Sequence, residues 1–526
     1  MSGSSRERVD VVIVGSGPAG AAYARTLADL WPQASILMVE AGPVIADPPG
    51  LHVANIKDDA ARLAAQIASQ GPHRHAAYDP ITEDEVTLRR QGGHDTSMLR
   101  RPGLFRVGDG PIDGEGFPAS HASHNVGGMG SHWFCACPRP DSDERIPFLS
   151  REVMDEALTS AEKLLRVSQT QFSDSHIAEP LRNALSALFD EGRSPGRRVQ
   201  PMPMAINVTE EGVYRTGSNV ILGDLVTAPR ARFELRPETV CRRILMQDRR
   251  ATGVELFSIK SNETYSVDAD VVIVAADSLH SPQLLFASGI RPPALGRYLN
   301  EHPQVTVLAE FEGVRPGGDV ALSFGGGVLG DRTVTARMSS GVTWVPYNGP
   351  TFPFHVQISQ VEPASLYGDD RAIGEKNAVL SISFFLPSDR QSENRVMFSE
   401  TERDWLGRPK MSLRFKLSDG DMKRISFARE TLEKICGKVG RMLPGHQIRV
   451  APYGTSLHYQ GTIGMGEQDD GASTCDRNSC VWGVDNVYVA GNGVIPTSTA
   501  ANPTLTAVGL AILGARHIAS THRAPR

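Results

Sequence analysis

Short apolar runs and one amphipathic stretch alternate near the start of the chain. Val9–Val14 (VDVVIV) is typical of a strand that is buried on both faces. A helical pattern, AAYARTLADL, follows, and a second strand pattern, SILMVE, ends at Glu40. A later run, ADVVIVAAD from Ala269 to Asp277, is expected to join the same parallel sheet, whereas Phe233–Phe257 is expected to form a strand meander. These patterns predict a Rossmann-like α/β domain.

The pattern changes between Gln304 and Arg449. An amphipathic helix is expected over Asp419–Leu443, and two more lie between Pro147 and Val199, where they are expected to cover the first domain. Polar and apolar residues otherwise follow strand-like runs, which predict a mostly antiparallel sheet. The runs are QVTVLAEFEG, TFPFHVQIS, AVLSISFFL, NRVMFSE and KMSLRFK.

These elements predict an α/β fold (α+β overall) with two domains. A chain of 526 residues is too long for one ordinary core. We expect residues 1–146, 200–303 and 451–526 to form a discontinuous nucleotide-binding domain. Residues 304–450, with the helical segment 147–199, are expected to form the substrate domain and its cover.

Composition narrows the function classes. The net charge of −6 and a pI of about 6.2 argue against nucleic acid as the main partner, because phosphate binding needs a concentrated basic face. The N-terminal segment lacks a signal-peptide pattern, and no stretch approaches the ~18 consecutive apolar residues of a membrane span. Six cysteines, at spacings unlike those of zinc sites, predict neither a disulfide framework nor a bound metal. A reducing cytoplasm is the expected compartment.

The turn after the first strand carries the clearest chemical signal. Gly15, Gly17 and Gly20 in GSGPAG have G-x-G-x-x-G spacing between a strand and a helix, and Glu40 ends the next strand. The glycines suit a tight turn, close approach of a pyrophosphate and close helix–strand packing. Glu40 would accept hydrogen bonds from the adenosine ribose. The motif predicts a dinucleotide and leaves NAD and FAD open.

Three further segments are rich in glycine and polar side chains. HNVGGMGSHWFCACPRP (His124–Pro140) suits close approach to a large flat ligand. SLHYQGTIGMG places His458 just ahead of a glycine-rich turn. VYVAGNGVIPTSTAANPTLTAVGLA runs from a strand into a helix that begins near Asn502-Pro503, where Asn suits the N-cap and Pro the first turn.

Together these motifs resemble one enzyme family. GSGPAG with Glu40, VGGMGSHW, LGRYLNEHP, HYQGTIGMG and NPTLTAVGLA occur in the order seen in the glucose–methanol–choline (GMC) family of FAD-dependent oxidoreductases. GGMGSHWFCACP and GNGVIPTSTAANPTLT look most like its pyranose-oxidase branch, which includes bacterial relatives that oxidise sugars and glycosides. The matching blocks span from Val11 to about Leu513. The resemblance implies FAD, so that the first domain is an FAD-binding domain.

The resemblance also implies roles for single residues. In the family a His and an Asn, or a second His, face the flavin, and the matching positions here are His458 and Asn502. An imidazole can take the hydroxyl proton while flavin N5 accepts the hydride, and the Asn502 amide can hold the hydroxyl and cap the helix that follows. That helix N-terminus would stabilise the anionic reduced flavin. The implied cofactor-binding residues are Gly15, Gly17, Gly20, Glu40, Gly127, Gly128, His132, Trp133, Gly491, Asn492, Pro503 and Thr504.

Two departures from the fungal pattern bear on the flavin and the substrate. The His that matches His132 is bonded covalently to the flavin in fungal pyranose oxidases and a Thr follows the Trp, whereas Phe134 stands there in this chain. We therefore expect non-covalent FAD, with a covalent bond to His132 as the alternative. Ser383 replaces an Arg of the sugar site, which favours glycosides oxidised at C-3, as in bacterial C-glycoside oxidases. The implied substrate-binding residues are Gln357, Phe134 and Tyr367, the last in the loop VEPASLYGDD.

Several functions remain open at this point. The favoured one is an oxidase that converts a ring hydroxyl of a sugar or glycoside to a ketone and reduces dioxygen to hydrogen peroxide. A dehydrogenase that uses a quinone-type acceptor, and a pyranose 2-oxidase that acts on free aldoses, keep the same chemistry. A non-catalytic flavin-binding protein and a nicotinamide-dependent dehydrogenase are the rivals from other classes. A homo-oligomer is compatible with the sequence.

Overall fold

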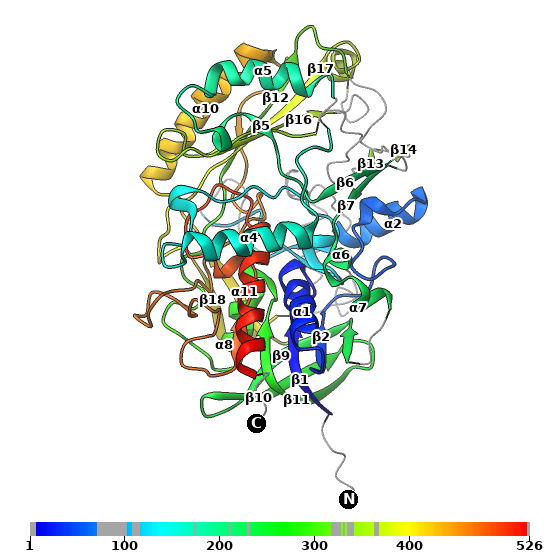
Figure 1. Cartoon of the computed structure of the whole chain (residues 1–526), viewed down its shortest axis with the longest axis vertical. Coiled ribbons are helices and arrows are strands. Elements are labelled where there is room, and N and C mark those ends of the chain that lie inside the picture. Colours follow the sequence, from blue (N-terminus) through cyan, green and yellow to red (C-terminus); the bar gives the residue numbers. More distant parts are fainter. Residues whose placement is uncertain are drawn as a thin grey trace, which may run out of the picture.

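The computed structural model describes residues 7–70, 103–107, 116–172, 175–209, 212–228, 232–316, 328–329, 332–333, 341–361, 368–404 and 406–522. The chain forms two lobes stacked along its long axis, each built on a sheet of its own (Figure 1). One sheet is mixed, with parallel strands at its centre, and the other is antiparallel. The predicted fold class is confirmed.

The first sheet places the nucleotide turn at its centre. Its strand order is β8-β2-β1-β11-β10-β9, with β22 beside β11. β1 lies parallel to both β2 and β11, and Val11 is aligned with Ile36 on one side and Val271 on the other. The fully buried side chains of β1 and β11 explain their continuous apolar runs. The strands are β1 (Glu7–Val14), β2 (Ile36–Val39), β8 (Phe233–Arg236), β9 (Thr239–Gln247), β10 (Arg250–Ser258), β11 (Glu263–Val274) and β22 (Val487–Val489).

The predicted meander over Phe233–Phe257 is wrong in its first strand. β9 and β10 do form an antiparallel hairpin, but β8 pairs in parallel with β2 at the sheet edge. The chain changes direction directly after β8, where Glu238 adopts a left-handed φ of 49°. A sequence pattern of alternating residues does not reveal which neighbour a strand will pair with.

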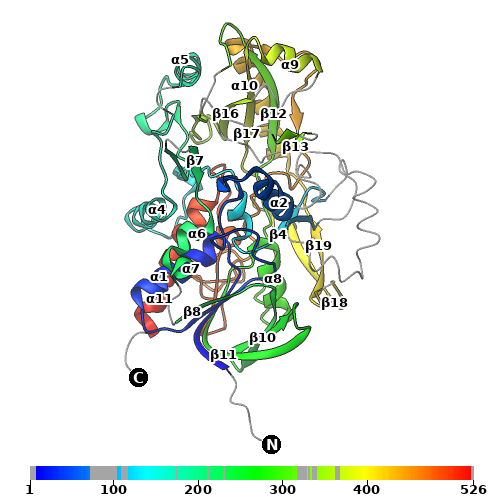
Figure 2. The same cartoon turned by 90° about the vertical axis from the view of Figure 1, so that its right-hand side faces the viewer.

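Helices cover both faces of the first sheet. α1 (Pro18–Leu30) and α11 (Thr504–His522) pack side by side, and α4 (Arg151–Leu165) packs on α11. α8 (Asp277–Ala287) lies on the opposite side of the strands (Figure 2). This follows from two right-handed crossovers that leave the sheet centre in opposite directions, from β1 to β2 and from β11 to β22. Both βα turns therefore open on one edge of the sheet.

The second sheet has the strand order β20-β12-β17-β16-β15-β5, with β21 also beside β12. α10 (Asp419–Val439) packs against β12, and α5 (Ala178–Phe189) packs against α10 and β15. The opposite face of the sheet is turned toward the first lobe (Figure 1). The strands are β5 (Gln200–Pro201), β12 (Gln304–Phe311), β15 (Thr343–Val345), β16 (His355–Val361), β17 (Ala378–Phe385), β20 (Gly440–Met442) and β21 (Arg449–Val450).

Two of the five predicted strands do not belong to this sheet. β18 (Arg395–Arg403) and β19 (Pro409–Arg414) form a separate hairpin against α8. Most residues of this hairpin are half-buried or exposed, so it lacks the buried second face that the central strands have. The remaining short elements are α2 (Asp59–Gln70), α6 (Ser218–Leu222), α7 (Asp224–Thr227), α9 (Gly368–Gly374), β3 (Gly103–Arg106), β4 (His121–His124), β6 (Ile206–Thr209), β7 (Gly212–Arg215), β13 (Val328–Leu329) and β14 (Arg332–Thr333).

Three further features of the described residues concern membrane spans, metal clusters and cysteines. Among the described residues, no helix combines the length and apolar character needed to cross a bilayer. The same residues contain no cluster of three or more metal-ligating side chains. All six cysteines are free thiols, and five of them are buried.

Close packing of the nucleotide turn generates a stability prediction. A Cβ on Gly20 would lie 2.1 Å from the carbonyl oxygen of Gly15, so Gly20→Ala should lower the unfolding free energy by about 1–3 kcal/mol. Gly437 is an exposed residue of α10, and a Cβ added there would meet no atom within 4 Å, so Gly437→Ala should raise it by about 0.5–1 kcal/mol. Urea unfolding of both variants checks the pair. Equal shifts of the same sign would contradict the packing argument.

Candidate active site

A cavity of about 890 Å³ lies between the two lobes. The βα turn of β1 and the end of β2 line its lower part, and the segment Gly128–Ala136 lines its middle. The antiparallel sheet forms its roof, and the loops that carry His458 and Asn502 complete the wall. The cavity therefore joins the predicted nucleotide turn to the predicted substrate domain.

Glu40 organises the nucleotide end of this cavity. Its Oε2 accepts hydrogen bonds from the Ser16 amide at 3.1 Å and the Ser16 hydroxyl at 2.7 Å, and its Oε1 accepts from the Gly42 amide at 3.2 Å. The Ser16 hydroxyl also accepts from the Gly127 amide at 2.9 Å. Burial raises the pKa of Glu40, although these hydrogen bonds act to lower it. The contacts tie the turn after β1 to the Gly127–Gly128 loop.

The residues present fit a dinucleotide such as FAD. A Cβ on Gly17 would meet no atom within 4 Å, so an open space lies directly against the backbone at the start of α1. Gly128 faces it, since a Cβ there would lie 3.2 Å from the Gly17 Cα. Arg215, 5% exposed, lines the cavity, and its Nε and Nη2 have no hydrogen-bond partner among the described residues. A buried guanidinium without a partner calls for an anionic or accepting group, which a pyrophosphate or flavin edge supplies.

The predicted flavin-binding residues gather around the middle of the cavity. Trp133 donates its indole N–H to the Thr216 carbonyl at 2.6 Å, which fixes the segment in place. The Nε2 of His132 lies 3.2 Å from the Ser123 hydroxyl, and burial lowers the pKa of His132 to about 4. The cavity lining includes Gly15, Gly17, Glu40, Gly128, His132, Trp133, Phe134, Gly491, Asn492 and Thr504, whereas Gly20, Gly127 and the buried Pro503 lie behind it.

His458 and Asn502 meet at the cavity wall. The His458 Nε2 lies 3.3 Å from the Asn502 Nδ2, although 44 residues separate the two positions in the chain. The Asn502 Oδ1 accepts a hydrogen bond from the Gln357 Nε2 at 2.7 Å. Burial lowers the pKa of His458 to about 3, so the imidazole is neutral at neutral pH. Gln357, on strand β16 of the roof, thus contacts the Asn502 side of the pair directly.

The side chain of Asn502 is committed to the site and does not cap the helix as the sequence suggested. α11 begins at Thr504, and both polar atoms of the Asn502 carboxamide point to Gln357 and His458. Backbone geometry alone starts the helix, with the Ala507 amide donating to the Pro503 carbonyl at 2.9 Å. The helix N-terminus still opens toward the cavity, because Thr504 lines it.

Two buried carboxylates anchor the loops that carry the pair. Glu301, 1% exposed, accepts hydrogen bonds from the Gly454 amide and from the Ser456 hydroxyl at 2.8 Å, just before His458. Glu144, 2% exposed, accepts from the amides of Ala500 and Ala501 at 2.7 and 2.9 Å, just before Asn502. Burial raises the pKa of Glu301 to about 8 and that of Glu144 to about 7. Each loop is thus fixed from behind by one carboxyl group.

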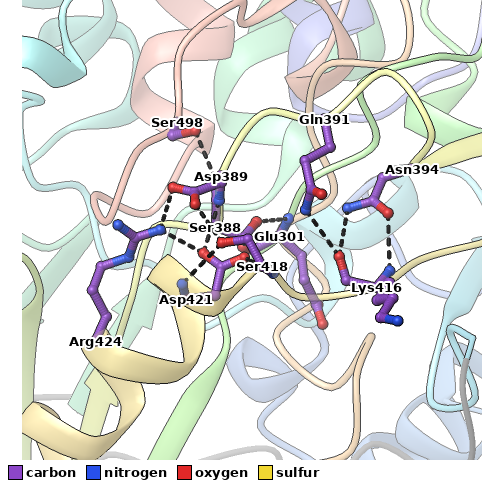
Figure 3. A network of polar contacts seen from close by, with 10 residues as sticks. All are labelled: Glu301, Ser388, Asp389, Gln391, Asn394, Lys416, Ser418, Asp421, Arg424 and Ser498. Atoms are coloured by element: carbon purple, nitrogen blue, oxygen red, sulfur yellow. Dashed lines mark hydrogen bonds and ion pairs between the residues drawn. The ribbon is translucent and has the colours of Figure 1, made fainter.

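A polar network links these loops to helix α10 (Figure 3). The Ser498 hydroxyl donates to the Ser388 carbonyl at 2.6 Å, and the Ser388 hydroxyl donates to the Glu301 carbonyl at 2.8 Å. The next residue, Asp389, donates its amide to Asp421, which closes a capping box with Ser418 at the start of α10. Arg424 pairs with both Asp389 and Asp421. The network therefore connects the start of α10 to the loops that carry His458 and Asn502.

Over the part of the chain that the structure describes, the roof of the cavity is polar and carries no charged side chain. Strand positions with period two turn one face of the second sheet to the cavity, as expected for a pleated sheet. Thr306 and Ser383 lie opposite each other on β12 and β17, with their hydroxyl oxygens 3.2 Å apart. The side chains that line this face are Gln304, Thr306, Gln357, Ser359, Val361, Ser381, Ser383 and Phe385.

The sequence pointed to some of these positions and missed others. Tyr367 lies outside the described residues. Glu301 and His302 stand in the quoted segment LGRYLNEHP, but nothing in the pattern showed that Glu301 anchors another loop. Arg215 had no sequence signal, because an exposed arginine and a buried, unpartnered one look alike in a sequence. Glu144 likewise had no sequence signal, since it stands in the polar stretch DSDER.

The buried Glu301 carboxyl generates a pH-dependent prediction. Its pKa is raised from 4.5 to about 8 by burial, so its contribution to stability is present below about pH 4.5 and is lost as the pH rises toward 8. Glu301→Gln keeps an acceptor for the Gly454 amide and stays neutral at every pH. The unfolding free energy of this variant relative to wild type should rise by about 2–4 kcal/mol from pH 5 to pH 8.

Urea unfolding at both pH values measures this change, and Glu467→Gln is the matched control. The Glu467 carboxylate is exposed and pairs with Arg477, so its replacement should give a pH-independent difference. A flat difference for Glu301→Gln would contradict the raised pKa.

The chain matches known proteins over nearly its whole length. Models of the GMC oxidoreductase family match residues 141–304 and 390–511. A C-glycoside 3-oxidase from Arthrobacter globiformis is 43% identical, with 99% of this chain and 96% of that protein aligned. A C-glycoside 3-oxidase from Microbacterium trichothecenolyticum is also 43% identical, over 97% of this chain and 96% of the relative. A pyranose 2-oxidase from Tricholoma matsutake is 28% identical over 97% and 93% of the two chains.

The fold likeness extends to solved structures. The crystal structure of pyridoxine 4-oxidase from Mesorbium loti superposes with a TM-score of 0.64 at 18% identity, covering 99% of this chain and 100% of that one. The sequence matches cover both lobes and the loops that carry His458 and Asn502. The protein therefore belongs to the GMC oxidoreductase family.

Proposed function

We propose that the protein oxidises the C-3 hydroxyl of C- or O-glycosides to a ketone, with FAD as the first electron acceptor and dioxygen as the second. The overall reaction converts one secondary alcohol and one dioxygen to one ketone and one hydrogen peroxide. The observation that carries the proposal is the contact of His458 with Asn502 in the wall of the cavity. The 43% identity to two proteins named C-glycoside 3-oxidase supports the choice of substrate and carbon.

The catalytic pair divides the work on the substrate hydroxyl. The His458 imidazole is neutral and can take the hydroxyl proton at Nε2, the nitrogen that faces the Asn502 amide, which supports its role as the general base. The Asn502 amide N–H lies next to the same nitrogen and can donate to the hydroxyl oxygen. Gln357 holds the Asn502 carboxamide in this orientation through its oxygen. FAD, when bound, accepts the hydride that leaves the same carbon.

The roof supports an uncharged, polyhydroxylated substrate. Hydroxyl and carboxamide groups of Thr306, Ser383 and Gln357 lie in one cross-strand row, and Ser359 and Ser381 lie in the next. Two residues along a strand span roughly 6.6 Å, about the width of a sugar ring. The first row therefore suits the ring that is oxidised, and the second suits the group attached to it. Because the described residues of the roof lining carry no charge, they would leave a free acid or phosphate unpaired.

Loss of the base tests the proposal. His458→Ala should slow anaerobic bleaching of the flavin by C- and O-glucosides by ~10²–10⁴-fold, because the hydroxyl proton loses its acceptor. His446→Ala is the control, since that imidazole pairs with Asp370 and does not line the cavity. Stopped-flow absorbance at the flavin band gives the rates. A normal rate in His458→Ala would remove this residue from the role of base.

The same experiment separates the rival functions. Wild-type protein that no sugar or glycoside bleaches would support a non-catalytic flavoprotein. Bleaching by free aldoses with a 2-keto product would support a pyranose 2-oxidase. Less than one peroxide per ketone in air, with fast turnover on a quinone, would support a dehydrogenase.

We also expect the FAD to be held without a covalent bond. The His132 Nε2 lies against the Ser123 hydroxyl, and burial keeps this imidazole neutral. Acid precipitation of the purified protein should leave the yellow flavin in the supernatant. Colour retained in the pellet of wild type, and lost from the pellet of His132→Ala, would show a bond to His132.

A further inference from the structure

A second histidine lies directly behind the catalytic one. The His302 Nδ1 is 3.0 Å from the His458 Nδ1, and the two ring planes meet at 70°. His302 is 1% exposed, and the edge of its ring packs against Phe385. His302 directly follows Glu301, whose carboxyl group anchors the His458 loop. These two adjacent residues therefore both contact the same loop. Its position therefore depends on the same buried framework as that of His458.

A contact between two Nδ1 atoms holds one proton. If the proton is on His458, then His302 accepts, and the Nε2 of neutral His458 is left with a free lone pair. If the proton is on His302, then His458 accepts, and its own proton must sit on Nε2, where it blocks the base. The tautomer of His302 therefore decides whether His458 can take a proton from the substrate.

The groups on the far side of His302 can serve the first arrangement. The His302 Nε2 lies 3.3 Å from the Thr499 hydroxyl and 3.0 Å from the Gln460 Nε2, which is a donor as placed. The Thr499 hydroxyl can accept a hydrogen bond from the Nε2–H. It can at the same time donate a hydrogen bond to the Gln460 Oε1 at 3.1 Å or the Ala501 carbonyl at 3.3 Å. A half-turn of the Gln460 carboxamide exchanges its oxygen and nitrogen, so this residue can also accept.

The Asn502 side favours the same arrangement. Its oxygen is occupied by Gln357 at 2.7 Å, so its N–H group faces the His458 Nε2 and requires an acceptor there. Two contacts act in the opposite direction. The Gln460 Nε2, as placed, lies 3.0 Å from the His302 Nε2 and would donate to it. The Trp344 indole can only donate, and it lies 3.3 Å from the His355 Nδ1, which places the His355 proton on Nε2 toward Gln357. The two contacts of His355 are 3.3 Å long, as is the contact between Asn502 and His458, whereas the contact between His302 and His458 is 3.0 Å.

We propose that His302 is a positioning residue that keeps the proton of His458 on Nδ1, so that Nε2 is free to accept the proton of the substrate hydroxyl. When the His458 ring becomes an imidazolium, His302 accepts from the charged Nδ1–H and stabilises it. Burial disfavours any cation in this site, so an acceptor at Nδ1 offsets part of that cost. The role in catalysis rests on the proposed function, in which His458 is the base.

Two variants separate the acceptor from mere packing. His302→Asn places an oxygen near the position of the lost Nδ1 and can still accept from His458, whereas His302→Leu has similar volume and no acceptor. His302→Leu should slow the limiting rate of anaerobic flavin reduction by roughly 10–100-fold, and His302→Asn should recover most of that loss. The dissociation constant of the glycoside should change little in either variant. Melting temperature and FAD content report on folding.

A spectroscopic measurement tests the tautomer without any turnover. FAD-loaded protein carrying ¹⁵N-labelled histidine should show the His458 Nδ1 protonated and Nε2 unprotonated at pH 7, with signals assigned through His302→Asn and His458→Asn. Protonation of the His458 Nε2 in wild type would overturn the proposal, as would equal rate losses in His302→Asn and His302→Leu. If no glycoside bleaches the wild-type flavin, the proposed function fails, and the NMR result still decides the position of the proton.

Discussion

The contact between the His458 imidazole and the Asn502 carboxamide depends on two carboxyl groups that are themselves out of contact with water. Glu301 fixes the segment before His458, and Glu144 fixes the segment before Asn502, each by accepting hydrogen bonds that include backbone amides. Burying a carboxyl group is costly, and the raised pKa of both side chains reflects that cost. In return, the hydrogen bonds hold each loop in one position, because a loop held by its own amides cannot move without leaving those donors unpaired.

The two lobes contribute different chemistry to one cavity. The parallel strands and the α1 N-terminus offer backbone amides, glycine surfaces and Arg215, which suit an anionic dinucleotide. The antiparallel sheet offers hydroxyl and amide side chains, which suit neutral sugar hydroxyls. The Asp389–Arg424–Asp421 network connects the second lobe to the loops of the first. A shift of α10 would therefore displace the loops that carry His458 and Asn502.

The sequence predicted those features of the fold that depend on residues close together in the chain, and missed those that depend on residues far apart. GSGPAG with Glu40 predicted the central βαβ unit, because strand, turn and helix lie within one short stretch. That β18 and β19 lie outside the second sheet, and that β8 pairs in parallel with β2, were missed, because the place of a strand in a sheet is set by residues far away in the chain. His458 and Asn502 came from motif resemblance. The role of His302 came only from the folded contact, since two histidines 156 residues apart carry no joint signal in the chain.

The central claim is that hydride leaves C-3 of a glycoside while His458 takes the hydroxyl proton of the same carbon. Glucosides deuterated at C-3 or at C-2 test it most directly, through the rate of anaerobic flavin reduction. The account predicts a primary isotope effect from deuterium at C-3 and a rate unchanged by deuterium at C-2. An isotope effect that arises from C-2 instead, with C-3 silent, would contradict it.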